Sequence, residues 1–87
     1  MPFFVKKPIP VEMRQWDGTV HCAQSLARWS HGRVQVDRGG DETHLIVHTQ
    51  HGKSVCVEGD WVVKGPAGEF YPITDAMKTA TYLPVEE

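Results

Sequence analysis

Residues 59–72 (GDWVVKGPAGEFYP) constrain the fold more strongly than any other part of the chain. Residues 60–64 alternate from face to face and are rich in β-branched and aromatic side chains, which predicts a strand. The Gly-Pro-Ala-Gly sequence of residues 65–68 fits a hairpin loop built around a β-turn with proline at its second position. The chain is extended again up to Pro72, which has no N–H for a ladder and so marks a strand end or an edge strand. We expect a β-hairpin on which the rest of the chain packs.

The part of the chain before this hairpin predicts a strand and then a helix. Residues 9–16 are predicted to form the strand, after an extended segment that contains proline. Thr19 is a suitable N-cap for a helix over residues 20–30. The apolar stripe of this helix consists of Cys22, Leu26 and Trp29. A helix of this length is marginal alone, so it is expected to pack on a sheet.

The remaining chain predicts short strands joined by tight turns, at residues 33–37, 43–49, 54–58 and 79–85. Residues 38–42 are expected to form a mobile loop, and Thr74 is expected to cap a single helical turn that ends at Lys78. Together these elements predict one α+β domain over residues 1–87. We expect a strongly bent antiparallel sheet of about six short strands with one α-helix packed on a face, and partial closure of the sheet into a barrel is an alternative.

Charge and cysteine content exclude several classes of protein. The formal net charge of the 87 residues is −2, which provides no basic field for nucleic-acid phosphates. The chain has two cysteines, fewer than a disulfide-stapled secreted domain normally carries. No apolar run is long enough to span a membrane, and no signal peptide is recognised. The expected location is therefore the cytoplasm.

Histidine and cysteine spacing does not predict a metal site. On a strand, His44 and His48 share a face but lie about 13 Å apart, which is too far for two ligands of one zinc ion. Cys22 and Cys56 are interpreted as core residues, although the loop length of the preceding hairpin decides which face Cys56 occupies. No motif surrounds a nucleophile. We therefore expect no metal, no cofactor and no enzymatic activity.

Aromatic side chains are the remaining feature that suggests binding. Six large aromatic residues, with Phe3 and Phe4 in addition, exceed what one helix and a small sheet can hide. An exposed aromatic patch would mark a partner surface or a homodimer seam, and Phe3 and Phe4 are the first candidates. The alternative is a pocket for a nucleotide. Its base would stack on Trp16, Trp61 and Tyr71, and its phosphate would meet Arg14, Arg33 or Lys64.

Each end of the chain carries a distinctive motif. The opening motif consists of Lys6-Lys7-Pro8, Val11-Glu12 and Gln15-Trp16-Asp17-Gly18. The closing motif consists of Gly59-Asp60-Trp61-Val62, Gly65, Gly68-Glu69-Phe70-Tyr71-Pro72 and Thr81-Tyr82. In these motifs the chain resembles a family of small proteins encoded by tailed bacteriophages and prophages. The family commonly has a cysteine where this chain has Ile73. The resemblance implies a phage accessory protein and assigns no catalytic residues.

These features lead to one leading functional hypothesis and two alternatives. The leading hypothesis is a non-enzymatic phage protein that binds and modulates a host or phage protein in the host cytoplasm. The first alternative is a pocket that sequesters a nucleotide or another small molecule and so counters host defence. The second is a minor component of the virion.

Overall fold

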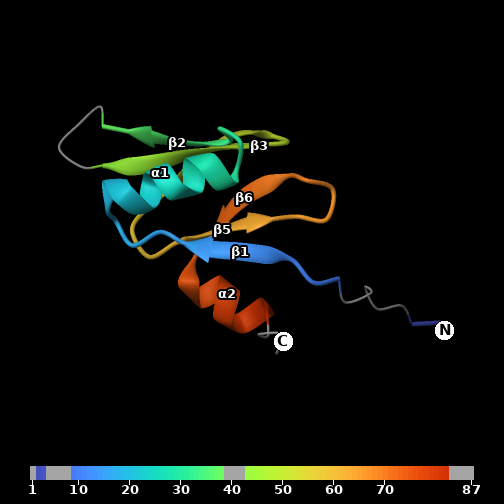
Figure 1. Cartoon of the computed structure of the whole chain (residues 1–87). Coiled ribbons are helices and arrows are strands. Elements are labelled where there is room, and N and C mark those ends of the chain that lie inside the picture. Colours follow the sequence, from blue (N-terminus) through green and yellow to red (C-terminus); the bar gives the residue numbers. More distant parts are fainter. Residues whose placement is uncertain (1, 4–8, 39–42, 83–87) are drawn as a thin grey trace.

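The chain folds into six short strands and two helices, and the computed structural model describes residues 2–3, 9–38 and 43–82 (Figure 1). In chain order the elements are β1 (Glu12–Gln15), α1 (Val20–Trp29), β2 (Val34–Asp37), β3 (His44–Thr49), β4 (Gly52–Cys56), β5 (Trp61–Lys64), β6 (Phe70–Ile73) and α2 (Asp75–Thr81). The strands form two antiparallel sheets: sheet A in the order β1-β5-β6, and sheet B in the order β2-β3-β4. The predicted α+β class is confirmed.

Sheet A is built on the predicted hairpin. β5 and β6 pair with Lys64 opposite Phe70 and Val62 opposite Pro72. The Gly65 N–H donates to the Glu69 carbonyl at 2.7 Å, and the Gly68 N–H donates to the Gly65 carbonyl at 3.0 Å, which closes the expected β-turn. β6 is an edge strand, as the lack of an N–H on Pro72 predicts.

Sheet B shows which face Cys56 occupies. Thr49 pairs with Gly52, so the β3–β4 loop has two residues, Gln50 and His51. This register places Cys56 opposite Leu45, and both side chains are fully buried. Cys56 therefore lies on the core face of sheet B, while His44 and His48 belong to the opposite face because side chains alternate along β3. The interpretation of Cys56 as a core residue is confirmed.

Helix α1 begins and ends where the sequence predicts. The Thr19 hydroxyl accepts a hydrogen bond from the Cys22 N–H at 3.1 Å, which caps the helix N-terminus. At the other end the buried Ser30 hydroxyl accepts from the Val34 N–H at 2.9 Å, which ties α1 to the start of β2. Leu26 is buried in the core between α1 and the two sheets.

Sheet A separates two layers of side chains, with α1 and sheet B on one side and α2 on the other (Figure 1). On the inner side, Phe70 packs edge-on against Trp29 with ring centroids 5.3 Å apart. On the outer side, Trp61 contacts α2 through a hydrogen bond from its Nε1 to the Asp75 carboxylate at 2.9 Å. The large aromatic side chains are thus divided between two faces of one sheet, and this arrangement hides more of them than a single layer would.

Three expectations differ from the structure. The strands form two sheets that do not close into a barrel, not one bent sheet. A second helix is present, because α2 continues beyond the single turn expected at residues 74–78. The strand predicted at residues 79–85 is wrong where it overlaps α2, and its last part, residues 83–85, lies outside the described residues, as do residues 39–42 of the expected mobile loop.

Candidate binding site

The three aromatic residues proposed to stack a base do not share a site. Trp16 is buried in the core at 1% exposure, and its Nε1 donates to the Thr19 carbonyl at 2.9 Å. Trp61 and Tyr71 lie on the outer face of sheet A, where the Lys78 ammonium covers the Trp61 ring at 4.7 Å from its centroid. The Tyr71 hydroxyl lies 3.3 Å from the hydroxyl of Tyr82 at the end of α2.

The basic residues proposed to meet phosphate lie elsewhere. Arg14 pairs with Val62, and its guanidinium lies over the Trp29 ring at 4.8 Å, on the inner side of sheet A. Lys64 is opposite Glu12 in the same sheet and shares that side, because side chains alternate along β5. Arg33 is exposed before β2. Sheet A therefore separates Arg14 and Lys64 from Trp61 and Tyr71.

Of the two phenylalanines proposed as a partner surface, Phe3 is 92% exposed. Phe4 lies outside the described residues. The side chain of Phe3 is thus accessible to a partner.

A second exposed apolar surface lies on sheet B. Val55 and Val57 are 56% and 51% exposed, and they flank the buried Cys56. Ile46 pairs directly with Val55 and is half-buried, so these three side chains form one apolar stripe on the outer face of the sheet. We call Ile46, Val55 and Val57 the valine surface.

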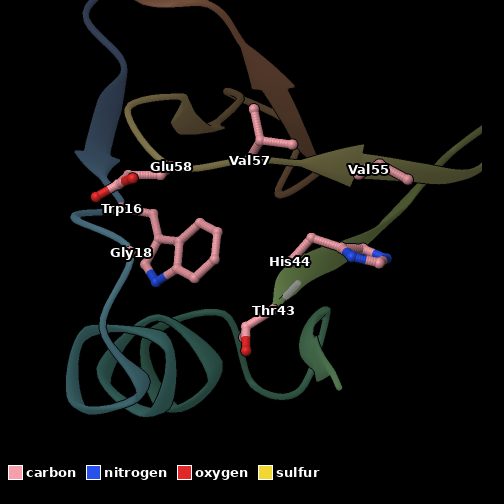
Figure 2. A pocket seen from close by; sticks show the side chains of 7 residues that line it. All are labelled: Trp16, Gly18, Thr43, His44, Val55, Val57 and Glu58. Carbon is pink, nitrogen blue, oxygen red and sulfur yellow. The ribbon is translucent and has the colours of Figure 1, made fainter. Parts of the chain in front are cut away.

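A cavity of about 570 Å³ borders the valine surface at the end of sheet B. Its lining residues are Trp16, Gly18, Thr43, His44, Val55, Val57 and Glu58. Figure 2 shows the Trp16 indole on one side of the opening and Thr43 and His44 on the other, with Val55 and Val57 along the chain that bounds it. The lining combines apolar walls with a few polar groups, which is typical of a binding cavity.

Polar pairs lie beside the apolar stripe, on the side of β2. The His44 Nε2 atom lies 3.0 Å from an Asp37 carboxylate oxygen, next to the cavity. Further along the same face, the His48 Nε2 atom lies 3.0 Å from the Gln35 amide oxygen. The outer face of sheet B therefore has an apolar stripe from the central strand β3 to the edge strand β4, with polar pairs on its β2 side, and apolar and polar groups combine in this way at protein–protein contacts.

A second cavity, of about 450 Å³, lies between the β3–β4 turn and the edge strand β6. We call it the hairpin cavity, and its lining residues are Thr49, Gln50, His51, Ser54, Glu69, Phe70, Tyr71 and Pro72. Glu69 has one carboxylate oxygen, Oε2, that is buried and has no hydrogen-bond partner among the described residues. Its carboxylate turns back over Gly65, where a Cβ would overlap with it. The absence of a side chain at Gly65 therefore permits the position of Glu69.

Burial also controls the ionisation of two groups. It raises the pKa of the Cys56 thiol to about 12, and the nearby charge of Asp60 adds to this effect. A thiol that stays protonated is a poor nucleophile. Burial likewise raises the pKa of Tyr71 to about 12, with smaller contributions from the Tyr82 hydroxyl and the Glu69 charge. No group of three or more potential metal ligands was found in residues 2–3, 9–38 and 43–82.

The valine surface and the hairpin cavity were both missed by reasoning from the sequence. One signal for the first was available: with Cys56 assigned to the core, alternation sends Val55 and Val57 to the other face. The hairpin cavity had no such signal, because it is formed by the β3–β4 turn and β6, which belong to different sheets.

Comparisons with models of protein families, with curated proteins and with solved structures found no match to this chain. Among the described residues, no helix is long and apolar enough to cross a membrane.

Proposed function

We propose that the protein is a non-enzymatic module that binds another protein through the valine surface. The observation that carries the proposal is that Val55 and Val57 are both more than half exposed and are continuous with Ile46 on the outer face of sheet B. An antiparallel sheet with one solvated face usually carries polar residues there. An apolar stripe on such a face marks a site that a partner covers.

Burial of the two valines against a partner would supply binding free energy. Covering apolar surface contributes about 25 cal/mol per Å², so two valines that are already fixed on a strand supply affinity at little cost in conformational entropy. The polar pairs His44–Asp37 and His48–Gln35 would form the rim, where polar contacts add specificity more than affinity.

The partner we propose is a host or phage protein in the host cytoplasm. This choice rests on the resemblance of both chain ends to a family of tailed-phage proteins. The distribution of aromatic and basic side chains over opposite sides of sheet A favours protein binding over the nucleotide pocket, since Arg14 and Lys64 do not face Trp61 and Tyr71.

The proposal is tested by capture of partners from host cells with the tagged full-length chain. The bound fraction is analysed for both proteins and small molecules. We expect one protein at a near-stoichiometric amount. The double variant Val55→Ser/Val57→Ser should bind that protein at least about tenfold more weakly, because a loss of about 1.4 kcal/mol in binding free energy is sufficient for a tenfold change.

The matched control is Met77→Ser. Met77 is 54% exposed, like the two valines, but it lies on α2, on the other side of sheet A. Its substitution should leave capture unchanged. Equal capture by the wild type and the double valine variant would contradict the proposal, and a bound nucleotide without a protein would favour the sequestering pocket instead.

A further inference from the structure

Glu69 is in an unfavourable environment within the described structure. Its Oε2 atom is shut off from solvent and accepts no hydrogen bond from the described residues. Leaving a buried polar atom unpaired is unfavourable, and more so when the group is charged. Such an atom at the wall of a cavity points to a missing partner that donates hydrogen bonds.

The chemistry of the hairpin cavity defines that partner. Among its lining residues Glu69 has the one carboxylate, and the side chains of Thr49, Gln50 and Ser54 have oxygens that can accept hydrogen bonds as well as groups that donate them. No lysine or arginine is among its described lining residues. The rings of Phe70 and Pro72 add apolar walls. A long side chain with methylene groups and a cationic end matches both the walls and the acceptors.

We infer that the hairpin cavity binds a lysine or arginine side chain of the protein partner, with the cationic group paired to Glu69. This inference rests on the proposed function, because it names the chemistry of that partner. The terminal torsion of a glutamate has a broad, roughly two-fold distribution of angles. Rotation of the carboxylate about this bond therefore presents either oxygen to the incoming cation.

Ser54 and Val55 lie on opposite faces of the edge strand β4, so one partner contacts both sites only if it reaches around that edge.

The test is a titration of the ¹⁵N-labelled full-length chain, followed by amide chemical shifts. The probes are a blocked Gly-Lys-Gly tripeptide, the same peptide with neutral norleucine in place of lysine, and butylamine. We expect the lysine peptide to shift the amides of residues 49–51, 54 and 69–71 in a saturable way. Binding of the norleucine peptide should be at least about tenfold weaker, since it lacks the charge.

Two variants complete the design. Glu69→Gln keeps the shape of the side chain and should weaken lysine-peptide binding by at least about tenfold. Glu58→Gln removes a carboxylate at the other cavity and should change nothing. Equal binding by Glu69→Gln, equal binding of the norleucine peptide, or no shift with any probe would overturn the inference. Butylamine binding as tight as the peptide would overturn the assignment to a partner side chain.

This titration and the capture experiment fail independently of each other. A positive titration with unchanged capture by the valine variant would overturn the valine surface and leave the basic-side-chain site intact. A negative titration with valine-dependent capture would overturn the basic-side-chain site alone.

Discussion

Burial keeps two ionisable side chains protonated in the folded state. The pKa of Cys56 and that of Tyr71 are both raised to about 12, mainly by burial. In the unfolded chain these groups have their ordinary pKa values, about 9 for the thiol and about 10 for the phenol. Between those values and about 12 the folded state holds more protons than the unfolded state. The free energy of unfolding must therefore fall as the pH rises through this window.

The prediction at this scale concerns Tyr71→Phe. The variant lacks the phenol, so its free energy of unfolding should decline less between pH 9 and pH 11 than that of the wild type, whatever the two values are at pH 7. Urea unfolding at a series of pH values measures the difference. Parallel declines for the two proteins would show that Tyr71 ionises equally in the folded and unfolded states.

Individual residues were predictable from the sequence where a local rule fixed their role. Thr19 as a cap, Cys56 as a core residue and Pro72 at an edge each follow from the chemistry of one side chain or one backbone group. The buried carboxylate of Glu69 did not follow, because its position depends on the space above Gly65. Only the folded turn creates that space.

At the scale of elements, the two helices have the same kind of cap but differ in how they are held against the rest of the protein. The hydroxyls of Thr19 and Thr74 each accept a hydrogen bond at 3.1 Å from the N–H three residues ahead. Helix α1 buries Ala23 and Leu26 in the core, whereas α2 has no buried residue. Polar contacts such as that of Asp75 with Trp61 hold α2 against sheet A.

This difference predicts unequal effects of removing the caps. Thr19→Ala should lower the free energy of unfolding of the whole protein by about 1 kcal/mol, the usual cost of a lost cap. Thr74→Ala should change global unfolding less, and it should speed amide hydrogen exchange within residues 75–82. Chemical denaturation and exchange, measured on both variants, test the pair. Equal global losses would mean that α2 unfolds together with the core.

The sequence predicted elements correctly where caps and turns bound them, as in α1 and the β5–β6 hairpin. It failed at α2, because Thr79, Thr81 and Tyr82 have the composition of a strand. The cap at Thr74 and the helix-forming residues that follow it outweigh this composition, and α2 runs to Thr81. Local propensity alone does not decide such a segment.

At the scale of the whole molecule, one short turn decides the architecture. Between β4 and β5 the Asp60 carboxylate accepts a hydrogen bond from the Val57 N–H, and Gly59 adopts a positive φ of 92° that favours glycine. This turn transfers the chain from sheet B to sheet A, so β4 remains an edge strand. The sequence signals a turn here but not whether β5 pairs with β4, so one sheet was expected. The exposed valine surface and the hairpin cavity both depend on this transfer.

The most direct measurement is photocrosslinking in host cells with a photoreactive amino acid in place of Val55. In a second protein the photoreactive amino acid replaces Met77, which is equally exposed on the opposite side of sheet A. We expect the first protein to form a covalent adduct with one host or phage protein, and we expect none with the second. An adduct at Met77 alone, or none at either position, would contradict the claim that the valine surface binds a partner.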